Sequence, residues 1–213
     1  MTLLSRAFQS PIAKSIGLMT TALAMTFVPA SSANAASKST FEVTPYIGYM
    51  AASDLQSPDG TSTLKVDSAS HFGIGIAWQD SPKGQGQVLV NAVSHNFEGV
   101  EANSKHSLDI IYAHFNGVAQ FRQNAYVTTF SLGVGGAYFD SQQSTTMAPS
   151  ATAAIGTRYE FSNSFALVTE VRAYASLVDE DDELFCENDA CAAQFDGSIF
   201  MEGALSFGIA YRF

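Results

Sequence analysis

Outside its first 35 residues the sequence lacks a long hydrophobic run, which excludes a membrane-spanning helix there. A helix needs about 20 consecutive apolar residues to cross a bilayer, and no stretch within residues 36–213 approaches that length. A chain that crosses a membrane without such a helix must form a closed β-barrel, because every backbone N–H and C=O has to be paired within the protein. Such a chain should show a repeat of two residues along its strands.

Positive charge is also scarce. The chain has 10 Lys and Arg against 20 Asp and Glu, and a formal net charge of −10. Binding to nucleic-acid phosphates requires a basic face. This charge balance therefore argues against nucleic acid as a partner.

The N-terminal residues have the pattern of a secretory signal peptide. Arg6 and Lys14 precede the uncharged run SIGLMTTALAMTFV, and the small residues SANAAS follow it. The run has about 14 residues, which is too short for a spanning helix, so a cleaved signal is favoured over an N-terminal anchor. We expect residues 1–35 to be removed after Ala35 and residues 36–213 to form one β-barrel domain.

Cysteine is limited to Cys186 and Cys191, in LFCENDACAA. A secreted chain reaches an oxidising compartment, where a disulfide persists. We expect these two residues to be bonded and to hold an exposed loop in shape. A metal site is the alternative, and it is weak because no His or second Cys pair lies nearby.

Eight segments show the expected repeat of two. In HFGIGIAW large apolar residues alternate with His, Gly and Ala, and the other segments follow the same rule. Each has close to the 9–11 residues that a tilted strand needs to cross the apolar layer. The segments cover residues 41–50, 71–78, 87–95, 111–121, 126–135, 151–161, 165–177 and 199–213.

The polar side of these segments indicates which way they face. It carries glycines and opposed charges, whereas Lys, which is common on the wet face of a soluble sandwich, is almost absent. We therefore predict an all-β fold, a closed antiparallel eight-stranded transmembrane barrel with large apolar residues turned to lipid. Long connections alternate with tight turns, which places both chain ends on the periplasmic side.

The chain ends in GSIFMEGALSFGIAYRF, with the aromatic Phe213 last. The signal peptide, the eight strands and this ending resemble the bacterial outer-membrane β-barrel family related to the transmembrane domain of OmpA and to OmpX. The resemblance implies the outer membrane of a Gram-negative cell, contact with lipid and lipopolysaccharide, and recognition of Ile209, Tyr211 and Phe213 by the barrel assembly machinery. The segment LFCENDAC resembles the disulfide-bearing last loop of one branch of the family.

Charged residues fall on the inward side of the last strands. Unpaired buried charge is expensive, and breaking such a pair costs about 3 to 5 kcal/mol, so we expect three Arg to pair with three Glu. An eight-stranded barrel encloses little more than its own side chains, which favours a plug over a conduction path. The predicted network comprises Arg158, Glu160, Glu170, Arg172, Glu202 and Arg212, with Glu42 as a further candidate.

His71, His95 and His114 lie on or near inward positions. Some outer-membrane lipid A deacylases are eight-stranded barrels with a Ser, a His and a carboxylate, and the segment VSHNF invites that comparison. A hydrolytic triad needs a nucleophile, a base and an orienting group within hydrogen-bond reach. The alternative is a set of lumen histidines that are hydrogen-bonded to carboxylates.

An acidic cluster lies in DEDDELFCENDAC. Its Asp179, Asp181, Asp182 and Glu183 form a possible site for Ca²⁺ or Mg²⁺, such as the ions that bridge lipopolysaccharide phosphates. The cluster lacks the EF-hand glycine, and a solvated acidic surface is the alternative.

We expect a monomer without cofactor or firm metal site and without enzymatic activity. Its predicted role is structural or in surface interaction through the external loops. A lipid A-modifying hydrolase is the first alternative, and a narrow porin-like channel is the second.

Overall fold

The computed structural model describes residues 41–57, 61–98, 105–141, 144–179, 183–184 and 193–213. All of them belong to one compact unit, Lys38–Phe213. The expected signal peptide, residues 1–35, lies outside the described residues, as do Cys186 and Cys191, so both remain predictions. No helix among the described residues is long and apolar enough to cross a membrane.

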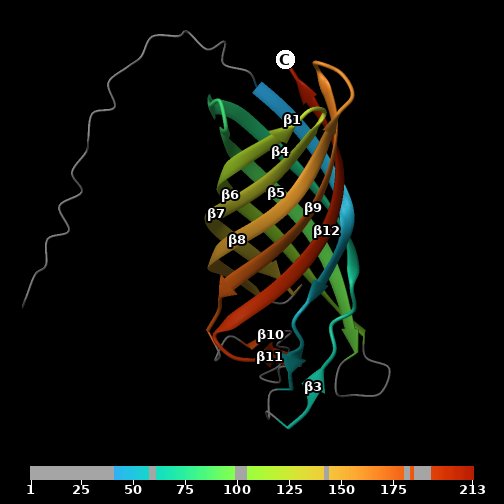
Figure 1. Cartoon of the computed structure of the whole chain (residues 1–213). Coiled ribbons are helices and arrows are strands. Elements are labelled where there is room, and N and C mark those ends of the chain that lie inside the picture. Colours follow the sequence, from blue (N-terminus) through green and yellow to red (C-terminus); the bar gives the residue numbers. More distant parts are fainter. Residues whose placement is uncertain (1–40, 58–60, 99–104, 142–143, 180–182, 185–192) are drawn as a thin grey trace, which may run out of the picture. The chain divides into compact units, whose positions relative to one another are not determined.

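Eight long strands close into one antiparallel barrel (Figure 1). Each pairs with its neighbour in the sequence of long strands, and the first closes the barrel by pairing with both the second and the last. This confirms the predicted fold class. The strands are β1 (Phe41–Ala52), β4 (Ala69–Ser81), β5 (Gly84–Glu98), β6 (Lys105–Gln123), β7 (Tyr126–Asp140), β8 (Thr145–Glu160), β9 (Phe165–Leu177) and β12 (Ile199–Arg212).

Large apolar side chains cover the outside of the barrel. In β12 every second residue from Ile199 to Tyr211 is exposed, and the residues between them are buried with the exception of the partly exposed Arg212. Phe72 and Ile209 expose 62% and 54% of their surface. Meanwhile Arg158 and Arg172 are buried. This confirms the predicted direction, with large apolar side chains facing outward and charged side chains facing the lumen.

One end of the barrel, called the turn end here, carries the short connections 82–83, 124–125 and 161–164 and the C-terminus (Figure 1). Asn124 takes a positive φ of 57° in the second of these turns, a conformation that Asn tolerates better than most residues. The first and last strands meet at this end, because Phe41 and Phe213 exchange two backbone hydrogen bonds of 3.2 and 3.0 Å.

The opposite end, called the loop end, carries a second small sheet that the sequence reading missed. Its strands lie in the order β10 (Glu183–Leu184), β11 (Ala193–Phe195), β2 (Leu55–Gln56) and β3 (Thr63–Leu64). Figure 1 labels β3, β10 and β11 beyond the ends of the barrel strands. Two connections that were expected to be loops therefore contribute short strands that pair with each other, β2 with β11.

The loop half of the barrel interior is mainly apolar, although it also holds the buried pair of His95 and Glu202. Side chains from the barrel strands and from the small sheet form one buried cluster, here called the apolar plug. The sequence predicted a lumen plugged by Arg/Glu ion pairs, whereas this half is filled mainly by apolar side chains. The plug comprises Met50, Leu55, Leu64, Val93, Phe97, Leu108, Ile110, Tyr112, Ala137, Phe139, Ala148, Tyr174, Val178, Ala193, Phe195, Phe200 and Ala204.

Candidate functional site

The lumen at the turn end is bridged by ion pairs around Glu42. Arg158 donates two hydrogen bonds to this carboxylate, at 2.7 and 2.6 Å. Arg212 lies 3.4 Å from Glu42 and 3.3 Å from Glu160, and Arg122 also pairs with Glu160. From the sequence, Glu42 was only a further candidate for the ion-pair network, yet its carboxylate pairs with two arginines.

A second ion pair lies farther along the lumen. Arg172 Nε donates to Glu170 at 2.8 Å. Its Nη1 reaches Asn116 on β6 at 3.4 Å and Thr152 on β8 at 3.3 Å. The guanidinium is buried, so one side chain links three strands through the lumen.

Glu202 differs from the expected pattern, since its partners among the described residues are a histidine and a tyrosine. His95 Nε2 lies 2.6 Å from its Oε1, and the Tyr112 hydroxyl donates to its Oε2. His95 Nδ1 lies 2.7 Å from the backbone oxygen of Asp67. The expected pairing of three Arg with three Glu was therefore wrong for this residue, which ties β12 to β5 and to the segment that follows β3.

His71 lies between a hydroxyl and an amide. Its Nε2 is 3.1 Å from Ser206 Oγ, and its Nδ1 is 2.9 Å from Asn91 Oδ1. Asn91 in turn donates to the Tyr174 hydroxyl at 2.9 Å. The order Ser, His and Asn is that of a hydrolytic triad, but all three residues are buried, with at most 4% of each exposed.

His114 has a different environment. Its ring lies 5.7 Å from Tyr112 and 5.6 Å from Tyr174, between centroids. Within the described part of the chain, neither ring nitrogen has a hydrogen-bond partner, and the same holds for Gln120 Nε2 and Ser131 Oγ. Buried polar atoms of this kind are commonly satisfied by ordered water.

No protein-family model matches the chain, and no curated protein matches it. Among solved structures, OprG from Pseudomonas aeruginosa aligns with a TM-score of 0.56 and 10% identity, over 82% of this chain and 96% of that one. Neisserial surface protein A aligns with a TM-score of 0.53 and 12% identity, over 81% and 97%. The chain has the fold of an eight-stranded outer-membrane β-barrel.

In this outer-membrane fold the residues expected to carry the assembly signal face outward. Ile209, Tyr211 and Phe213 are exposed, and the Tyr211 ring lies 5.0 Å from Phe165 and 5.9 Å from Phe213. The rings of Phe165, Tyr211 and Phe213 form an aromatic rim at the turn end. Recognition of Ile209, Tyr211 and Phe213 by the assembly machinery remains a prediction.

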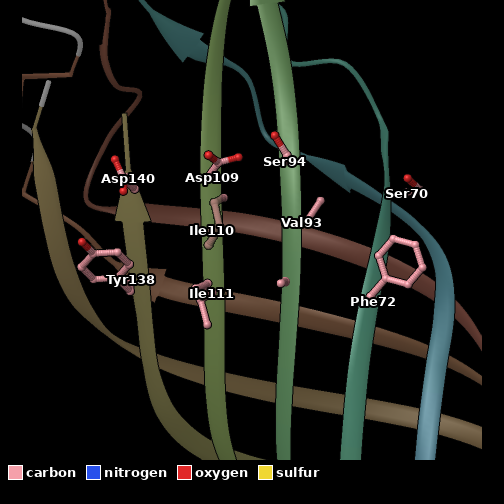
Figure 2. A pocket seen from close by; sticks show the side chains of 10 residues that line it. Ser70, Phe72, Val93, Ser94, Asp109, Ile110, Ile111, Tyr138 and Asp140 are labelled. Carbon is pink, nitrogen blue, oxygen red and sulfur yellow. The ribbon is translucent and has the colours of Figure 1, made fainter. Parts of the chain in front are cut away.

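The outer face of the barrel is grooved near the loop end. The groove is lined by Phe72, Ile111 and Tyr138 together with the carboxylates of Asp109 and Asp140 (Figure 2). Asp109 and Asp140 are cross-strand neighbours on β6 and β7. The position therefore combines apolar surface with negative charge.

The predicted cation loop lies mostly beyond the described residues. Asp181 and Asp182 fall outside them, Glu183 is described only as part of β10, and Asp179 is exposed. Within the described ranges, no group of three potential metal ligands occurs. The cation site therefore remains a prediction.

Proposed function

We propose that this protein is an outer-membrane barrel that conducts no solutes, carries no enzymatic activity and contacts partners through its loop end. The single observation that carries the proposal is that ion pairs and an apolar cluster fill the lumen at two levels, inside a barrel whose outer surface is apolar.

The outer surface supports insertion into a bilayer. Phe72, Leu132 and Val134 expose 62%, 72% and 70% of their surface. Soluble monomers rarely expose contiguous apolar patches of more than a few hundred Å², whereas a transmembrane barrel presents an apolar band about 25 Å tall. Aromatic residues at the turn end, such as Tyr126 and Tyr159, suit the lipid–water boundary.

Closure at the loop end supports the absence of conduction. The rings of Phe139, Phe195 and Phe200 pack edge to face with centroids 5.4 to 5.7 Å apart, and each is at most 2% exposed. Phe195 belongs to β11 of the small sheet, so the sheet inserts a side chain into the barrel. The Glu42 ion pairs close the other half.

The small sheet supports a contact role. Gln56 of β2 donates to Asp196, which follows β11, so the two long connections are joined as one platform. Its outward residues include Thr63, Lys65 and Asp67, all exposed. A surface that is fixed by sheet pairing loses little conformational entropy on binding.

Planar bilayer recording tests this proposal. Purified protein is first shown to be a folded barrel by heat-modifiable mobility in a gel and is then added to the bilayer. We expect no conductance steps from the wild type. Regular steps from the wild type would overturn closure and favour the narrow-channel alternative.

A hydrolase remains the second candidate because of the Ser206, His71 and Asn91 array. The segment VSHNF suggests His95 for this role, but the structure places a serine hydroxyl beside His71. Burial inside the lumen separates these groups from lipid, which is why we favour a non-enzymatic role. Acyl release from labelled lipopolysaccharide that is lost in Ser206→Ala would reverse this preference.

A further inference from the structure

A second groove runs along the outer face near the turn end. Its floor has no side chain larger than a methyl group, because Gly84, Gly86, Gly117 and Ala119 lie side by side on β5 and β6. A Cβ built on Gly117 would meet no atom within 4 Å. The floor is therefore open toward the surroundings of the barrel.

The walls of this groove are aromatic and aliphatic. The Trp78 indole folds over Gly86, where an added Cβ would lie 2.4 Å from it, and packs against Phe115 at 5.5 Å between ring centroids. Phe130 and Leu132 on β7 form the facing wall and are 46% and 72% exposed. An apolar groove of this kind on the outer surface suits an extended hydrocarbon chain.

The mouth of the groove carries one charge of each sign. Asp80, near the end of β4, and Lys83, in the tight turn between β4 and β5, both line it. Both are exposed, and no side-chain partner of either is recorded among the described residues. An ammonium would complement Asp80, and a phosphate would complement Lys83.

We propose that this groove binds one zwitterionic phospholipid of the phosphatidylethanolamine class. One acyl chain lies between Trp78 and Phe130 over the glycine floor, the phosphate pairs with Lys83, and the ammonium pairs with Asp80. The proposal rests on the proposed membrane location. The groove in Figure 2 is not equivalent, since its charged lining residues are the carboxylates Asp109 and Asp140.

The chain supplies a matched control for the test. Gly203 on β12 is also exposed, and a Cβ built there also meets nothing within 4 Å, but it lies outside the groove. Gly117→Leu fills the groove, whereas Gly203→Leu adds the same side chain elsewhere on the outer surface. Neither substitution disturbs the lumen.

Native mass spectrometry of the full barrel, released from micelles that contain equal amounts of phosphatidylethanolamine and phosphatidylglycerol, counts the retained lipid. We expect one phosphatidylethanolamine on the wild type and on Gly203→Leu, and roughly tenfold less on Gly117→Leu, which corresponds to about 1.4 kcal/mol. Equal retention by all three proteins, or none by the wild type, would overturn the proposal.

Two further substitutions test the assignment of the lipid headgroup to Asp80 and Lys83. Asp80→Asn is expected to remove the preference for phosphatidylethanolamine, and Lys83→Gln to weaken retention of both lipids. An unchanged preference in Asp80→Asn overturns the assignment of the ammonium. Gel mobility of the same samples separates the two proposals. A folded, heat-modifiable barrel that retains no lipid contradicts only the groove, whereas a chain that does not form such a barrel contradicts the proposed function.

Discussion

The two halves of the lumen are filled mainly by different chemistry. In the turn half buried ion pairs cross the lumen, with Arg158 donating twice to Glu42. The loop half is filled mainly by the apolar plug, in which side chains of the small sheet meet those of the barrel beside the buried pair of His95 and Glu202. In both halves the side chains along each strand point alternately out of the barrel and into the lumen. The alternation therefore determines which side chains enter the lumen, whereas the partners available at each end determine which chemistry is stable there.

The largest loss of unfolding free energy is expected for a substitution in the apolar plug. Phe200→Ala removes a ring that packs against both Phe139 and Phe195, and such a truncation costs about 3 to 5 kcal/mol of unfolding free energy. Urea unfolding of the barrel in lipid vesicles measures the loss. Phe200→Leu, which leaves a smaller cavity, should cost less, and equal losses for both variants would contradict tight packing.

In the ion-paired half, the unfolding free energy should depend on the charge of the buried side chains and not on their volume. Glu42→Gln leaves Arg158 without its carboxylate, which costs about 3 kcal/mol, whereas replacing a buried pair by apolar residues is often neutral. The double variant Glu42→Leu with Arg158→Met should therefore recover most of the loss in the same unfolding assay. If the single change is neutral, the pair does not stabilise the turn half.

The hydrogen bond between Ser206 and His71 lies in the lumen and is predicted to be structural only. Ser206→Ala removes one neutral hydrogen bond, which contributes about 0.5 to 1.5 kcal/mol. Unfolding free energy should fall by that amount, and labelling by a fluorophosphonate probe should be absent in both proteins. Labelling of the wild type that disappears in the variant would contradict a structural role.

The smallest effect is expected at the rim of the turn half. Arg122 pairs with Glu160, but its side chain is 49% exposed, and exposed pairs contribute about 0.2 to 1 kcal/mol. Arg122→Gln should therefore change the unfolding free energy by less than about 1 kcal/mol. The difference should shrink further at high salt. A loss as large as that of Glu42→Gln would remove the distinction between rim and interior.

The strands and their direction could be predicted from the sequence, because a repeat of two over about ten residues is a strong signal. The small sheet could not, since β2, β3 and β10 have two residues each and carry no period. Arg122 was missed because it lies one residue beyond the predicted segment 111–121. The pairing of Glu202 with His95 depends on which side chains meet across the lumen, and composition favoured an arginine.

Trp78 allows the most direct test of the central claim, that large apolar side chains face lipid while charged ones face the lumen. It is the only tryptophan in the chain, so its fluorescence reports one position on the outer face near the turn end. In vesicles of lipids that carry bromine on the acyl chains, we predict blue-shifted emission with strong quenching, greatest for bromine near the headgroup. Emission that brominated lipid leaves unquenched would place Trp78 away from hydrocarbon and contradict the account.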